Sequence, residues 1–127
     1  MRALAAWLPA IAIAAIIFTL SAQPNLQITD GTVDLVLRKL AHVTFFGLLA
    51  AACVRGLAFH GITGRAALVA AAALATVYAI SDEYHQTFVA GRSGSPIDVA
   101  IDLAGILVAV ALLARNPRLH ARILAPA

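Results

Sequence analysis

The side chains best suited to chemistry lie in one polar stretch, Ser81 to Asp102, of an otherwise apolar chain. They are carboxylates, an amide and a guanidinium: Asp82, Glu83, Asp98, Asp102, Gln86 and Arg92. Carboxylates shielded from water can act as general acids or bases or can orient a ligand, and we assign the acid/base role to Asp82 and Glu83. The alternative is a purely structural role, in which both carboxylates connect helices through ion pairs with Lys39 and Arg92.

Two cations are suited to an anionic headgroup. Arg92 offers a planar bidentate fork and Lys39 a point charge. Asp98 is a candidate site carboxylate, but it also belongs to a helix-start signal in which Ser95 is the cap and Pro96 the first residue. Asp102, one turn later, is expected to face the bundle interior in a structural or proton-linked role, since an ionised Asp is costly at membrane depth.

Two histidines are candidate metal ligands. His42 and His85 with Asp82 and Asp98 match no zinc signature by their spacing, so we expect no metal and no cofactor. We place His42 and Gln86 among the ligand-binding residues instead. The chain has no Gly-x-Ser-x-Gly motif and no glycine-rich phosphate loop, and Cys53 is its single cysteine, which disfavours covalent catalysis.

The elements that must position these residues are apolar helices. Of the 127 residues, 62% are hydrophobic and 12% charged, whereas soluble domains are usually about 45–50% apolar. Mostly apolar segments long enough to cross a bilayer predict helices over about 3–22, 33–59, 65–86 and 96–114, and the first of these has no charged residue. We therefore expect an all-α integral membrane four-helix bundle, formed by one domain over 1–127. Short connections predict antiparallel neighbours.

The two ends of the chain need separate interpretation. The first apolar segment is longer than the usual h-region of a signal peptide of about 7–15 residues, so we expect it to remain as a membrane helix. Asn116-Pro117 should end the fourth helix, and a basic tail should follow. The basic residues are scattered without interleaved aromatics, so we expect no nucleic-acid partner.

Basic residues also predict the orientation in the membrane. The side with both termini would hold six of them: Arg2, Arg55, Arg65, Arg115, Arg118 and Arg122. The other side would hold three: Arg38, Lys39 and Arg92. The positive-inside rule then places both termini in the cytoplasm. The polar stretch, Lys39 and His42 would converge at the outer face, where we expect Lys39 to pair with Asp82 and Glu83 and offset their unfavourable helix-dipole positions.

These motifs together resemble the VanZ-like family of small bacterial membrane proteins over about residues 16–113. The resemblance rests on Lys39-Leu40-Ala41-His42-Val43, Ser81 to Phe88, Gly91-Arg92, Ser95 to Val99, and Gly105. It implies a multi-pass protein of the bacterial inner membrane, linked to envelope maintenance or to glycopeptide resistance, since the founding member is associated with resistance to teicoplanin. One position departs from the family pattern, which usually has Asn where this chain has Asp102.

The residues favour binding of an anionic cell-envelope lipid or a lipid-linked cell-wall precursor at an extracytoplasmic site. They leave open whether the protein is an enzyme. One alternative is a membrane hydrolase or transferase that uses Asp82 or Glu83 as acid or base. Another is a proton-coupled carrier subunit with Asp102 as the proton site. The sequence does not specify the oligomeric state.

Overall fold

The computed structural model describes residues 2–24 and 31–124 of the chain, so most of the segment between the first two expected helices lies outside the described residues. Within these ranges the chain forms helices and no strand: α1 (Arg2–Ser21), α2 (Gly31–Phe59), α3 (Gly64–Gln86), α4 (Pro96–Arg115) and α5 (Pro117–Leu124). The first four are long and apolar enough to cross a membrane. The all-α class and the four apolar helices are therefore confirmed, with bounds within about two residues of those expected.

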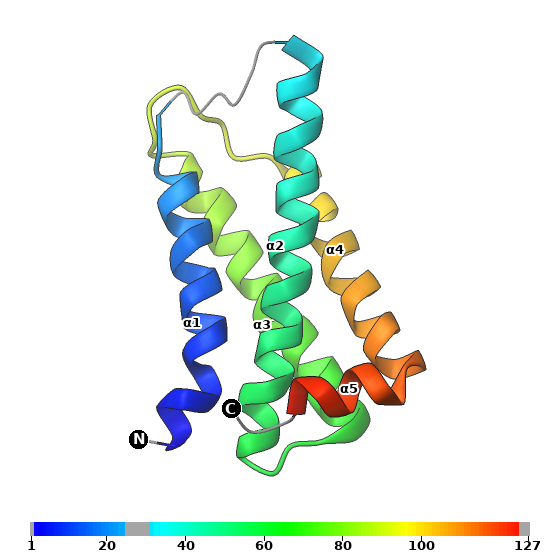
Figure 1. Ribbon diagram of the computed structural model, residues 1–127. Coiled ribbons are helices and arrows are strands. Elements are labelled where there is room, and N and C mark those ends of the chain that lie inside the picture. The colour runs from blue at the N-terminus through cyan, green and yellow to red at the C-terminus, as the bar shows by residue number, and fades with distance from the viewer. Residues whose placement is uncertain (1, 25–30, 125–127) are drawn as a thin grey trace.

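The basic segment after Pro117 forms a further helix, α5, which the sequence pattern does not predict. Asn116 leaves the helical conformation, with φ −121° and ψ 91°, and so ends α4. Its side chain then accepts a hydrogen bond from the backbone N–H of Leu119, with Oδ1 and N 3.1 Å apart, which is an N-cap for the next helix. Figure 1 shows α5 lying across the end of the bundle where α1 begins and α4 ends.

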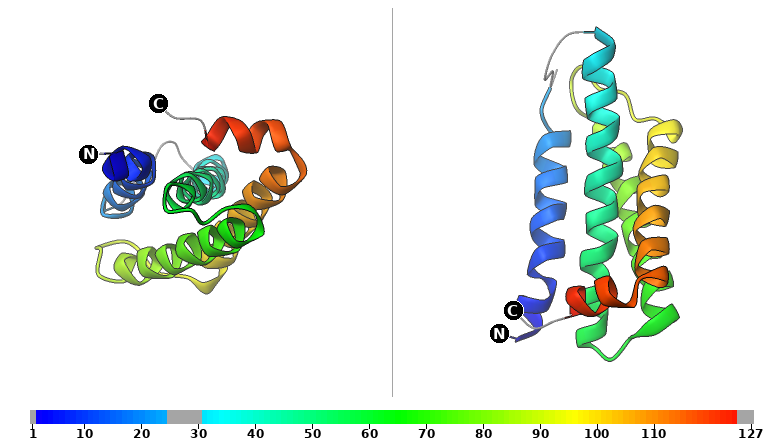
Figure 2. Two further views of the ribbon diagram at one scale, coloured as in Figure 1. Left: turned by 90° about the horizontal axis from the view of Figure 1, so that it is seen from below. Right: turned by 45° about the vertical axis from the view of Figure 1, so that its right-hand side comes forward.

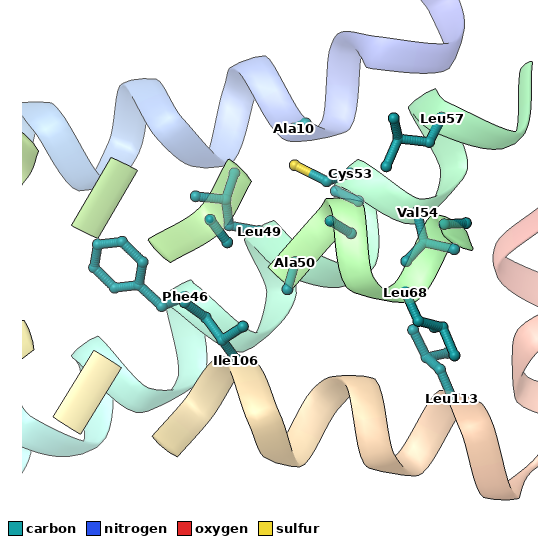
Figure 3. Packing of buried hydrophobic residues seen from close by; sticks show 14 of the residues in the cluster. Ala10, Phe46, Leu49, Ala50, Cys53, Val54, Leu57, Leu68, Ile106 and Leu113 are labelled. Carbon is teal, nitrogen blue, oxygen red and sulfur yellow. The ribbon is translucent and has the colours of Figure 1, made fainter. Parts of the chain in front are cut away.

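Helix α2 is the centre of the bundle. It contacts each of the other described helices, and Figure 2 shows it between α1 on one side and α3 and α4 on the other. Its buried side chains carry much of the apolar cluster, which includes Phe46, Ala50 and Val54 (Figure 3). Every other described helix is thus held in place against α2.

Small residues allow the helices to approach closely. In α3, a stripe of buried alanines four residues apart faces the core: Ala67, Ala71, Ala75 and Ala79. Between α2 and α4, a Cβ added at Gly105 would collide with the backbone carbonyl of Val43. Such close packing is typical of membrane helices. It brings the polar first turns of α4 directly against the polar first turns of α2.

Candidate functional site

Two polar pairs join α2 to α4. Lys39 forms an ion pair with Asp98, and one turn further along, His42 Nδ1 lies 2.9 Å from Asp102 Oδ1. The spacing of three residues on α2 and four on α4 puts both pairs on the facing sides of the two helices. Asp102 is completely buried, whereas the His42 side chain is 22% exposed. The expectation that Asp102 faces the bundle interior is therefore confirmed.

The carboxylates of α3 are held by an amide and a hydroxyl. Gln86 Nε2 donates to Asp82 Oδ2 and to Glu83 Oε1, both at 3.0 Å. Ser21 Oγ, at the end of α1, donates to Asp82 Oδ2 at 2.8 Å. All four residues are buried, so this network links α1 to α3 away from water.

The loop between α3 and α4 contacts both the side chain and the backbone of Glu83. Ser95 N–H donates to Glu83 Oε2 at 2.9 Å, while the Ser95 hydroxyl accepts from Ile97 N–H and caps α4 as expected. Gly94 packs so closely that a Cβ there would collide with the backbone carbonyl of Glu83. Gly91 makes the turn with a φ of +77°, which glycine adopts without steric cost. The start of α4 is thus anchored to the end of α3.

Arg92 ties this loop to the first helix. Its Nη1 donates to Gln86 Oε1 at 3.1 Å, and its Nη2 and Nε donate to the backbone carbonyls of Leu20 at 3.0 Å and Gln23 at 3.3 Å. Burial lowers the pKa of the Arg92 guanidinium, and the positive charge of Arg38 lowers it further. The two arginines therefore repel each other, and an anion between them would relieve the repulsion.

The pairing expected for Lys39 was wrong. Lys39 pairs with Asp98 on α4 instead of with Asp82 or Glu83, and Arg92 bonds to the amide of Gln86 and to carbonyls of the α1 end. The reason is geometric. The close contact of α2 with α4 puts Lys39 beside Asp98, while Gln86 and Ser21 already occupy the α3 carboxylates.

Arg38 also belongs to the site, although the sequence indicates it only as a marker of membrane orientation. It forms an ion pair with the buried Asp34, with Nε and Oδ2 2.9 Å apart. Asp34, Arg38 and His42 are spaced by four residues each and so share one face of α2. That spacing was a signal for a polar helix face directed at the site.

Two adjoining cavities open at these residues. A polar one of about 200 Å³ is lined by residues of α2, α3, α4 and the loop: Leu35, Arg38, Lys39, His42, Gln86, Gly91, Arg92, Ser93 and Asp98. A largely apolar one of about 150 Å³ is lined by residues of α1, α2 and the loop: Ile17, Leu20, Ser21, Arg38, Ala41, His42, Phe45, Phe46 and Arg92. Both share Arg38, His42 and Arg92. All five residues assigned to ligand binding, Lys39, His42, Gln86, Arg92 and Asp98, meet at the polar cavity.

The two carboxylates assigned to acid/base chemistry are not among the residues that line the polar cavity, and neither is Asp102. Asp82 and Glu83 both accept a hydrogen bond from Gln86, which does line it. His42, Glu83 and Asp102 each offer a potential metal-ligand atom, and these atoms lie within 4.8 Å of one another. No local sequence pattern indicates this group, because its members come from three helices.

The comparisons with known proteins agree with the motifs described above. A family model described as VanZ/LLP1 matches residues 4–117. No curated protein and no solved structure matches the chain.

Proposed function

Because the chain belongs to the VanZ/LLP1 family of membrane proteins, we propose that it binds an anionic cell-envelope lipid or lipid-linked cell-wall precursor between α1, α2 and the loop before α4. The headgroup occupies the polar cavity, and the first part of the tail occupies the apolar one. The helices cross the membrane in alternating directions with both termini in the cytoplasm, so the ligand enters from the extracytoplasmic leaflet.

The observation that carries this proposal is that a polar and an apolar cavity adjoin and share two arginines, Arg38 and Arg92. A lipid has the same division, with charge at one end and hydrocarbon at the other. Arginine is suited to phosphate because its fork makes two parallel hydrogen bonds. Both shared arginines are cations, which favours an anionic headgroup over a neutral or cationic one, although Asp82 and Glu83 offset part of the effect of Arg38 on Arg92.

Native mass spectrometry of the detergent-purified chain with its retained lipids tests this function. The wild type should carry an anionic lipid, and Arg38→Gln or Arg92→Gln should reduce its occupancy at least about tenfold, equivalent to about 1.4 kcal/mol. Arg55→Gln is the matched control, because Arg55 lies in the same helix as Arg38 but at its other end. Retention of only neutral lipids, or equal occupancy in all four proteins, would contradict the proposal.

A membrane hydrolase or transferase is the second candidate, favoured by the burial of Asp82 and Glu83 one amide away from the polar cavity. Incubation of the purified protein with lipid-linked precursors tests it, since product should form with the wild type and not with Glu83→Gln. A carrier with Asp102 as the proton site is favoured by the complete burial of that carboxyl. Reconstituted transport that is indifferent to pH and to Asp102→Asn would argue against this carrier.

A further inference from the structure

His42 on α2, Glu83 on α3 and Asp102 on α4 form a buried group of potential metal ligands. Hydrogen bonds do not satisfy every oxygen atom of this group. Glu83 and Asp102 are 5% and 0% exposed. Among the described residues, Asp102 Oδ2 is buried without a hydrogen-bond partner, although its partner oxygen Oδ1 lies against His42. A buried carboxylate oxygen that lacks a partner carries a large desolvation cost unless a cation or a proton compensates it.

We propose that His42, Glu83 and Asp102 bind one divalent transition-metal ion, with Mn²⁺ the best match to the donor set. The donor set is one imidazole nitrogen and two carboxylates. Transition metals favour imidazole as a ligand, and Mn²⁺, like Mg²⁺, also binds carboxylates. Two carboxylates also neutralise a divalent ion, so the filled site carries no net charge in the apolar interior.

The distances fit a single ion. Ligand atoms bound to one ion at about 2.0–2.4 Å can be no further apart than about 4.8 Å, and the three atoms lie within 4.8 Å of one another. His42 Nδ1 and Asp102 Oδ1 are 2.9 Å apart. The same distance is that of their hydrogen bond, which a bound ion would replace. Adjacent ligands of an octahedral ion with bonds of about 2.1 Å lie about 3.0 Å apart, so these two atoms could bind it without moving apart.

Hydrogen bonds and helix packing hold these ligands in place. Ser95 N–H and the Gln86 amide orient the Glu83 carboxylate, and the close contact of Gly105 with Val43 holds α4 against α2 beside His42. Such outer partners are a usual part of metal sites. Three protein ligands leave open positions on an octahedral ion, and His42 lines both cavities. A phosphate oxygen of the ligand could occupy one such position, a step that rests on the function proposed above.

The cation site can be tested without any lipid. The full chain is purified in detergent, delipidated, stripped with a chelator, dialysed and titrated with Mn²⁺, and free Mn²⁺ is followed by its electron paramagnetic resonance signal. The wild type should bind about one ion per chain. Based on the loss that altered metal sites usually show, His42→Gln, Glu83→Gln and Asp102→Asn should each weaken binding at least about tenfold.

The matched control is His85→Gln. His85 is a histidine of the same polar stretch that stacks on Phe18, with ring centroids 4.5 Å apart, and its removal should leave Mn²⁺ binding unchanged. If the three variants and the control bind Mn²⁺ equally, or if the wild type binds none, the proposal is overturned.

A spectroscopic readout needs no variant, which matters if a substitution prevents folding. Electron spin echo modulation of bound Mn²⁺ should show coupling to an imidazole nitrogen. Protein labelled with ¹⁵N-histidine should show this coupling at a different modulation frequency. Bound Mn²⁺ without nitrogen coupling would exclude this site. Because these measurements use delipidated protein, a failure of lipid binding leaves the cation result intact, and the reverse also holds.

Discussion

His42 Nδ1 lies 2.9 Å from Asp102 Oδ1 and joins the central helix α2 to α4 at the wall of the two cavities. Asp102 is completely buried and His42 largely so. This contact belongs both to the packing of the bundle and to the candidate site. It also involves the one carboxylate at which the chain departs from the pattern it resembles.

A double-mutant cycle on His42→Gln and Asp102→Asn should give a coupling free energy of unfolding of about 1–2 kcal/mol. The reason is that a hydrogen bond with a charged partner is stronger than a neutral one, and the two residues are in direct contact. Reversible thermal or denaturant unfolding in detergent, in a metal-free buffer, provides the measurement. Additive effects of the two substitutions would mean that the contact does not stabilise the bundle.

Gly105→Ala should destabilise the bundle by about 1–3 kcal/mol, because its methyl group would meet the carbonyl of Val43 and force α4 away from α2. The exposed neighbour Ala104 provides the control, since Ala104→Val adds bulk on the outer side of the same helix. Unfolding of the three proteins in the same detergent measures the difference. Equal stability of Gly105→Ala and the wild type would show that the two helices can separate without cost.

Two serines near Asp82 should behave differently. Ser21→Ala removes the buried donor to Asp82 Oδ2 and should cost about 1 kcal/mol of unfolding free energy. Ser81→Ala removes only a local bond to the carbonyl of Tyr78, three residues before it, at an exposed position, and should be near neutral. A larger loss for Ser81→Ala would contradict the importance of the link between α1 and α3.

A bulky residue in the apolar cavity should displace the lipid tail. Ala41 lines this cavity, so Ala41→Trp should lower the occupancy of the retained anionic lipid in native mass spectra at least about tenfold. Leu40→Trp is the matched control, because Leu40 is 56% exposed on the outside of the same helix. Undiminished occupancy in Ala41→Trp would place the tail elsewhere.

The expected orientation can be read by thiol labelling. In a Cys53→Ala background, Ser93→Cys in the loop before α4 should react with a membrane-impermeant maleimide added to intact cells or spheroplasts. His120→Cys in α5 should react only after permeabilisation, because the positive-inside rule places this end in the cytoplasm. The reverse pattern would invert the proposed topology and move the site to the cytoplasmic leaflet.

Composition and periodicity were enough to predict the helices. Four uncharged or weakly charged segments must be helical in a membrane, because a helix satisfies its own backbone hydrogen bonds, and their bounds follow from the prolines and polar residues at their ends. The Ser95 cap was predicted for a similar reason, since it depends on a few neighbouring residues. α5 was missed because eight amphipathic residues beside arginines also fit a solvated tail.

Only the tertiary structure decided which charges meet. Helical spacing placed Lys39 and His42 on one face, and Asp98 and Asp102 on another, but pairing depends on which helices touch and at what depth. The close approach at Gly105 selects Asp98 for Lys39 and Asp102 for His42. The grouping of His42, Glu83 and Asp102 and the role of Arg38 in both cavities follow from the same packing. Contacts between helices far apart in the chain leave no local pattern in the sequence, because they depend on the whole bundle.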